Sequence, residues 1–169
     1  MLLMFLIYYV VNRNSFIMKK MVLLFTLSLL FANEREIPLE KLFQTELKIK
    51  GKVFNLWLAL SPKQQQEGLS SLDSDEVDIN EGMLFIYPIN KIQTFWMKNT
   101  FIDLDIAFID ESGEICNIYS MEQRSKKYFS STKNIRYVLE LRQGIFEELN
   151  LVIGDKINIP QLIKEFSQS

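Results

Sequence analysis

The sequence predicts a mainly β protein: a single small antiparallel β-sandwich or barrel with one or two short helices, preceded by an N-terminal hydrophobic segment. Three observations support this fold class. Short apolar runs recur along the 169 residues with turn residues between them, which is typical of strands in one compact domain. Several of these runs alternate apolar and polar residues, which is the period of a strand. Helix signals are confined to short stretches.

The strands are expected at close intervals along the chain. Two follow one another from Glu46 to Leu60, with a turn at Lys50-Gly51-Lys52. Further strands are expected over residues 83–87, 91–97, 102–109, 114–121, 136–142 and 156–159. Residues 110–113 (Asp-Glu-Ser-Gly) are typical of a hairpin turn, because glycine supplies a positive φ. The basic, serine-rich residues 123–134 indicate a loop.

Two short helices complete the prediction. Ser61 is a favourable N-cap, Pro62 suits the first helical position, and Gln64 can complete a capping box. Gly68 is a suitable end for this helix. Residues 144–149 predict one or two further helical turns.

The first 32 residues are predicted to be a hydrophobic leader. Residues 21–31 form an apolar run that follows Met18-Lys19-Lys20 and ends at the small residue Ala32. A basic segment, an apolar run and a small residue make up a secretory signal peptide, and the best match starts at Met18. The alternative is an uncleaved membrane anchor. We therefore expect a leader over 1–32, a linker over 33–45 and a β domain over 46–169, exported to the periplasm or the cell exterior.

Composition excludes several classes of function. The net charge is −2, and removal of the leader would leave 16 basic against 21 acidic side chains, which argues against nucleic acid as a partner. The chain has no histidine, which excludes every catalytic triad or zinc site that uses imidazole. The single cysteine, Cys116, is expected to be buried. No pattern predicts a metal or cofactor, since the acidic loop 73–81 lacks the spacing of a calcium loop.

One run near the middle of the chain predicts a site. Phe95-Trp96-Met97 is followed directly by Lys98-Asn99-Thr100. Aromatic and hydrogen-bonding side chains are therefore expected side by side at the boundary between the buried core and the surface. Small-molecule and sugar sites are commonly lined in this way. A polar turn is the alternative, because Asn tolerates the left-handed conformation and Thr bonds its own backbone. The candidate ligand-binding residues are Trp96, Met97, Lys98, Asn99, Thr100, Asp105 and Glu140.

The carboxylates near this run allow more than one interpretation. Asp103 and Asp105 are two apart on an expected strand, so their side chains would lie about 7 Å apart on one side. They could be a hydrolytic pair, a solvated face, or, for Asp105, a partner of Lys98 and of buried backbone amides. Glu140 stands between two leucines and is either exposed or buried. A buried Glu140 would need a cation, and the candidates are Lys98, Arg136 and Arg142.

These motifs occur in an order that resembles one known family. They are Gly68-Leu69, Gly82-Met83-Leu84-Phe85, Phe95 to Thr100, Leu104-Asp105, residues 137–141 (Tyr-Val-Leu-Glu-Leu), Gly144 and Gly154-Asp155. The chain resembles domain-of-unknown-function family 192 over roughly residues 46–160. The resemblance implies a small mainly β domain, often exported, with no established reaction. The chain departs from the family at Asp103, where proline is usual, and at Ser70-Ser71-Leu72, where a basic residue is frequent.

Three functions fit these observations. The first is a binding or accessory module of the cell envelope, in which Trp96 stacks on a small molecule or glycan, Lys98 and Asn99 bind it, and Asp105 and Glu140 hold Lys98. The alternative is a hydrolase of a glycan-like substrate, with Asp103 or Asp105 and Glu140 as acid and base. The third is a structural partner of an envelope protein, which predicts an exposed apolar patch without a concave site. Membrane contact is expected only through an uncleaved leader.

Overall fold

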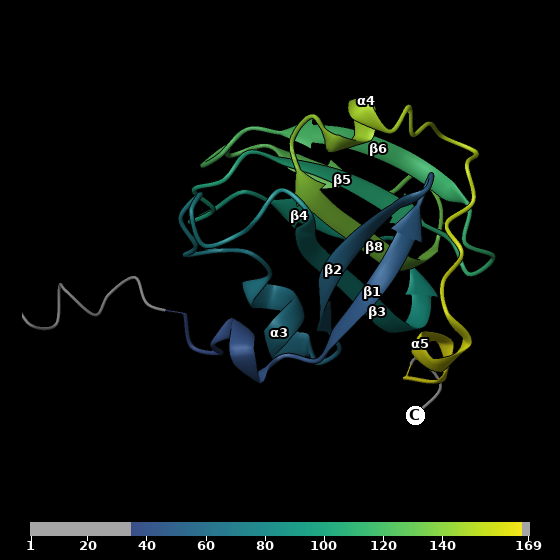
Figure 1. Cartoon of the computed structure of the whole chain (residues 1–169), viewed down its shortest axis with the longest axis horizontal. Coiled ribbons are helices and arrows are strands. Elements are labelled where there is room, and N and C mark those ends of the chain that lie inside the picture. Colours follow the sequence, from purple (N-terminus) through teal and green to yellow (C-terminus); the bar gives the residue numbers. More distant parts are fainter. Residues whose placement is uncertain (1–34, 167–169) are drawn as a thin grey trace, which may run out of the picture. The chain divides into compact units, whose positions relative to one another are not determined.

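A computed structural model describes residues 35–166 of the chain (Figure 1). The leader predicted over residues 1–32, with its start at Met18, lies outside the described residues. In chain order the strands are β1 (Gln44–Ile49), β2 (Lys52–Ala59), β3 (Glu81–Lys91), β4 (Thr94–Trp96), β5 (Leu104–Ile109), β6 (Ile115–Met121), β7 (Tyr128–Ser130) and β8 (Ile135–Arg142). The helices are η1 (Leu39–Lys41), α3 (Pro62–Glu67), α4 (Ile145–Glu148) and α5 (Gln161–Phe166).

Six of these strands form one mixed sheet in the order β1-β2-β3-β8-β5-β6, and β4 pairs with β7 in a second sheet. The mainly β prediction is confirmed, but the wholly antiparallel sandwich or barrel is wrong. Strands β2 and β3 are parallel, because α3 and the loop after it carry the chain back to the end where β2 began. Strands β1 and β6 lie at opposite ends of the strand order and do not pair with each other, so the described sheet is open.

The local signals in the sequence place the turns and the first helix correctly. The Ser61 side chain accepts a hydrogen bond from the backbone N–H of Gln64, and the Gln64 side chain accepts one from Ser61, which completes the capping box. Gly68 ends the helix with a φ of 53°. Lys50 and Gly51 both have positive φ values in the β1–β2 turn. These signals succeed because each depends on residues within one turn of the chain.

The structure differs from the prediction where pairing is non-local. Strand β7 lies inside the expected loop 123–134 and pairs with β4, which is itself shorter than the expected strand 91–97. The expected last strand, 156–159, is reduced to one bridge between Glu114 and Lys156. A third α-helix, α5, was not expected; it buries Ile163 against the core.

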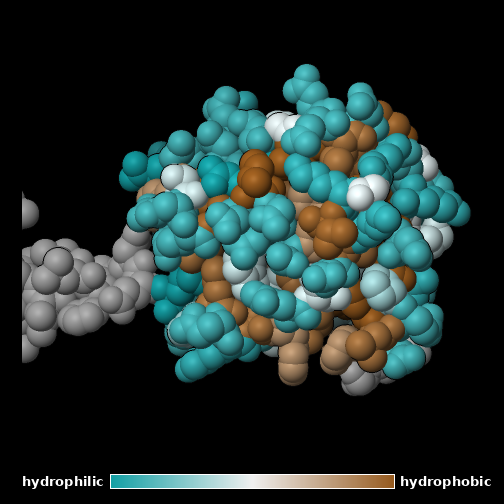
Figure 2. Space-filling model, viewed as in Figure 1, coloured by the Kyte–Doolittle hydropathy of each residue, from teal (hydrophilic) through white to brown (hydrophobic). Residues whose placement is uncertain are grey.

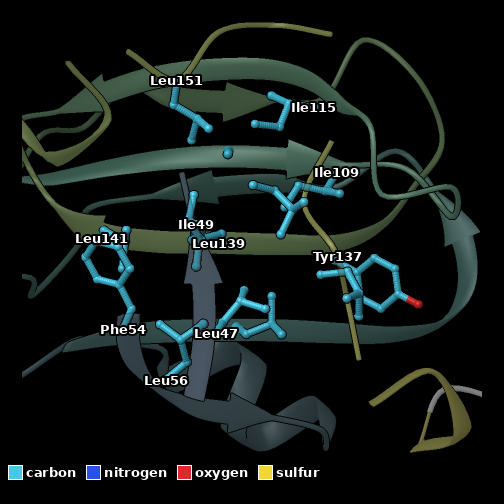
Figure 3. Close-up of a cluster of buried hydrophobic side chains, with 14 of the residues drawn as sticks. Leu47, Ile49, Phe54, Leu56, Ile109, Ile115, Tyr137, Leu139, Leu141 and Leu151 are labelled. Carbon is cyan, nitrogen blue, oxygen red and sulfur yellow. The ribbon is translucent and has the colours of Figure 1, made fainter. Parts of the chain in front are cut away.

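Both faces of the main sheet are covered, so every residue of β5 is buried. Figure 3 shows the cluster on one face, in which side chains from β1, β2, β5, β6 and β8 lie together with Leu151. Ile145 and Phe146 of α4 belong to the same cluster. The other face holds Met83, Phe85, Ile106 and Val138, and it is covered by the segment after α3 and by the 94–97 region. A side chain that points to this second face therefore lies beneath the segment after α3 and the 94–97 region.

The surface in the view of Figure 2 is mainly hydrophilic, with apolar side chains emerging between the polar ones. Phe43 and Phe166 are two of the exposed apolar residues, and their rings stack with centroids 6.1 Å apart. Among residues 35–166, no helix combines the length and the apolar character needed to cross a membrane.

Candidate functional site

The run from Phe95 to Thr100 forms a ridge at the end of β4. Strand alternation ends at Met97, which is buried in the core, and Lys98 and Asn99 then project outward. Asn99 adopts a left-handed φ of 57°, and the Thr100 N–H closes the turn on the Met97 carbonyl at 3.2 Å. The polar-turn interpretation is thus correct for the backbone, and the same turn presents Trp96, Lys98 and Asn99 to solvent.

A cleft of about 510 Å³ lies on one side of this ridge. Its walls are the end of α3 with Gly68 and Ser70, and the segment from Lys91 to Thr100. Glu140 of β8 lies in the lining, together with Phe85, Tyr87 and Leu104. Of the seven predicted site residues, the cleft brings together Trp96, Lys98, Asn99, Thr100 and Glu140.

Glu140 occupies the apolar second face of the sheet, with Met83 and Ile106 as its cross-strand neighbours. Only 5% of the residue is exposed, and within residues 35–166 its carboxyl group has no hydrogen-bond or ion-pair partner. Burial raises the pKa of Glu140 to about 8, because desolvation disfavours the charged form. Burial, and then the nearby Glu140 charge, also raises the pKa of Tyr87.

The expectation that a buried Glu140 needs a cation is therefore wrong. Its charge is avoided by protonation at neutral pH rather than compensated by Lys98, Arg136 or Arg142. A protonated carboxyl group both donates and accepts a hydrogen bond. The wall of the cleft thus carries a neutral donor–acceptor group with no protein partner among the described residues.

Asp105 lies on the opposite face of the main sheet, away from the cleft. One of its oxygens, Oδ1, accepts a hydrogen bond from Ser120 Oγ at 2.6 Å. The other, Oδ2, accepts from the N–H groups of Gly144 and Phe146 at 2.8 and 3.2 Å. Gly144 has no side chain to cap α4, so Asp105 caps this helix from the neighbouring strand. The expected bond to backbone amides is confirmed.

The expected ion pair between Lys98 and Asp105 or Glu140 does not form among the described residues. Lys98 Nζ instead lies 5.3 Å from the ring centroid of Trp96, a distance typical of a cation–π contact. Trp96 as a whole residue is 48% exposed. Trp96 and Lys98 together offer a flat apolar surface with a cation beside it.

The carboxylates of the hydrolase hypothesis do not converge. Asp103 accepts the Gln123 N–H at 2.6 Å and lines a different hollow, together with Arg142. Glu67 also borders the cleft, but it accepts the N–H groups of Glu36 and Ile37. Its carboxylate also pairs with Arg35 at 3.8 Å. Glu140 is thus the one carboxyl group in the described lining that remains free to act on a ligand.

The sequence prediction missed a further polar residue of the cleft. Gln93 lies in the lining, and its amide Nε2 is buried without a hydrogen-bond partner in the described part of the chain. A lone glutamine before an aromatic strand carries no signal in the sequence that its amide will be unpaired. Gln93 and Glu140 therefore both bring polar groups without a described protein partner to one cleft. The fully buried Gln93 Nε2 is unusual, because buried polar groups are nearly always hydrogen-bonded.

Other candidate groups have structural roles or none. Cys116 is buried as expected, and its pKa is raised, first by burial and then by the charge of Asp110, so the thiol is poorly suited to act as a nucleophile. Within residues 35–166, no three acidic or thiol side chains are grouped so that they could hold a metal ion.

The fold and the cleft define a small mainly β domain with one open mixed sheet and a polar cleft beside the ridge. Residues 45–159, well over half of the chain, match the family described as DUF192, Uncharacterized ACR. The chain belongs to this family, which confirms the resemblance drawn from its motifs. No curated protein matches the chain.

Solved structures that are similar to this chain include the two that follow. One is a protein of Sinorhizobium meliloti 1021, provisionally described as a transcription regulator, with 29% identity, a TM-score of 0.61, and coverage of 68% of this chain and 91% of its own. The other is a protein of unknown function from Novosphingobium aromaticivorans DSM 12444, with 28% identity, a TM-score of 0.66, and coverage of 73% and 90%. Neither description assigns a ligand.

Proposed function

We propose that this domain is a binding module that takes a hydroxylated, carbohydrate-like ligand in the cleft beside the ridge. The observation that carries the proposal is the buried Glu140 carboxyl group, which faces the cleft without a protein partner within residues 35–166. An unsatisfied buried polar group destabilises a fold by about 1–3 kcal/mol. Such a group is retained when a ligand supplies the missing hydrogen bonds.

The chemistry of the lining supports a sugar over an apolar ligand. The lining is rich in amide and hydroxyl side chains, which suit the alternating donors and acceptors of sugar hydroxyls. Trp96 supplies an exposed ring at the rim, and aromatic faces favour the flat C–H surface of a sugar ring. Glu140 is assigned to bind one hydroxyl as both donor and acceptor.

We further propose that the module works outside the cytoplasm, as an accessory protein of the cell envelope. The support is the sequence of the leader alone. If the leader is removed after Ala32, N-terminal sequencing of the mature protein should find Asn33 as the first residue. N-terminal sequencing of the precursor tests the start at Met18, and a peptide that contains Asn12-Arg13 would contradict it.

The hydrolase alternative has no geometric support. The two-carboxylate mechanism needs both groups about 5–9 Å apart around one bond, whereas Asp105 is engaged on the far face and Asp103 lines another hollow. A purely structural role is also less well supported, because it predicts no concave site.

Titration calorimetry with neutral tetrasaccharides of glucose and of N-acetylglucosamine tests the binding proposal. We expect dissociation constants below the millimolar range, and we expect Glu140→Leu to abolish binding. Glu140→Gln keeps a donor and an acceptor, so it should retain binding at neutral pH while removing a loss of affinity above about pH 8. Phe43→Ala, at an exposed residue outside the cleft lining, is the control. No binding by any probe, or equal binding by Glu140→Leu, would overturn the proposal.

A further inference from the structure

A second hollow of about 470 Å³ lies on the other side of the ridge. It shares Trp96, Lys98 and Asn99 with the cleft, so the two hollows meet along one short run of chain. We call the second hollow the cationic groove. It is lined by Trp96, Lys98, Asn99, Arg124, Ser125, Lys126 and Tyr128.

The groove has an aromatic floor because β4 and β7 pair there. Trp96 and Tyr128 are direct cross-strand partners, and their rings stack at 5.9 Å with an interplanar angle of 16°. They are 48% and 68% exposed. The two rings stack on each other and hold one another in place at the groove, where their exposed parts can contact a ring-shaped ligand.

The groove is also a local exception to the acidic character of the chain. Its lining contains Lys98, Arg124 and Lys126 and no acid, and none of the three forms an ion pair with a described residue. The backbone of Arg124 is held at the groove, because its backbone N–H donates to the Thr100 carbonyl at 2.9 Å. Its guanidinium lies 5.4 Å from the Phe101 ring centroid. Uncompensated cations beside an aromatic floor favour an anion that carries a ring.

We propose that the cleft and the cationic groove form one extended site for a carboxylated polysaccharide. One sugar unit lies against Glu140 in the cleft, the chain crosses Trp96, and the carboxylate of a following unit lies among Lys98, Arg124 and Lys126. This inference rests on the proposed function, and it adds both the polymeric nature and the charge of the ligand. A polysaccharide fits better than nucleic acid. The protein has a net charge of −2, and three positive side chains on it would attract a phosphate backbone only weakly.

Calorimetry on the full-length protein with tetragalacturonate and with neutral maltotetraose, two chains of equal length, tests this inference. We expect the charged chain to bind about tenfold tighter at low salt, with a preference that shrinks as salt rises. The double variant Arg124→Gln/Lys126→Gln should remove this preference. The matched control Lys41→Gln/Lys48→Gln removes the same charge from exposed lysines outside both hollows, and it should keep the preference.

The outcomes separate the two proposals. Equal affinity for both chains in the wild type would overturn the extended site and leave the cleft proposal standing. Binding of neither chain would overturn both. Tighter binding of a single-stranded thymidine octamer than of tetragalacturonate, lost in the Arg124→Gln/Lys126→Gln variant, would assign the groove to nucleic acid and overturn the polysaccharide assignment.

Discussion

Asp105 and Glu140 are buried carboxyl groups on adjacent strands of one sheet, and they differ in nearly every other respect. Asp105 has three hydrogen-bond donors within reach, whereas Glu140 has no partner among the described residues. Asp105 faces the helix α4, and Glu140 faces an open cleft. The comparison teaches that one group stabilises the fold and that the other is retained despite destabilising it. Only the second is a marker of function.

The largest expected effect concerns the pH dependence of stability, which Glu140 should dominate. The pKa of Glu140 is about 8 in the folded protein and about 4.3 in an unfolded chain. At a pH between these two pKa values, Glu140 carries a proton in the folded protein but not in the unfolded chain. Its contribution to the free energy of unfolding is therefore fully present below the unfolded pKa and is lost as the pH rises through the folded pKa. We expect a loss of roughly 3–5 kcal/mol across this window.

Urea unfolding at a series of pH values measures this loss. Glu140→Gln should flatten the profile, and Glu122→Gln, at an exposed position, is the matched control that should not. A wild-type profile that stays flat through the window would show that Glu140 is paired or solvated.

Asp105→Asn should give the next largest effect. The amide replaces a carboxylate that accepts from Ser120, Gly144 and Phe146. Its one oxygen can still accept from the two N–H groups, but the negative charge that strengthens those bonds is lost, and the Ser120 hydroxyl then faces an NH2 group to which it cannot donate. We expect a loss of about 2–4 kcal/mol in the free energy of unfolding. Asp103→Asn, which affects a carboxylate with a single backbone donor near the surface, should cost much less. Equal losses in the two variants would contradict the capping role of Asp105.

Gly82→Ala tests how tightly β3 and β8 approach beside Glu140. An added Cβ at this position would clash with the Glu140 carbonyl oxygen, so the backbone must shift. We expect a loss of about 1–3 kcal/mol, measured by the same unfolding experiment. Gly82 does not have a positive φ, so the loss of stability would come from the steric contact and not from backbone strain. An unchanged stability would show that β3 and β8 can move apart without cost.

Lys98→Met should have the smallest effect. Lys98 is exposed and forms no ion pair with a described residue, so we expect a change below about 0.5 kcal/mol in the free energy of unfolding. The same variant should weaken binding of tetragalacturonate. A loss of stability as large as that of Asp105→Asn would show that Lys98 belongs to a structural network after all.

The sequence predicted the local parts of this structure and not the non-local ones. Ser61, Gly68 and the Lys50-Gly51 turn were identified because their signals act over a few residues. The parallel pairing of β2 with β3 was missed because it depends on how far α3 and its loop return the chain. The pairing of β4 with β7 was missed because the partner strand lay in an expected loop.

The candidate site was predicted in part for the same reason. The run from Trp96 to Thr100 was identified from its composition, and it borders the cleft. The period of two placed Asp105 and Glu140 within their strands, but it could not say which face of each strand lies against α4 and which lies under the cleft. Gln93 was missed because a single unpaired amide has no sequence signature.

The most direct test of the account is urea unfolding of Glu140→Leu near neutral pH, because leucine fills a similar volume between Met83 and Ile106. If the carboxyl group is retained for a ligand and destabilises the fold, this variant should be more stable than the wild type by about 1–2 kcal/mol. It should also lose binding of the tetrasaccharides. A loss of stability of about 2 kcal/mol or more would contradict the account, because Glu140 would then hold the fold together as Asp105 does.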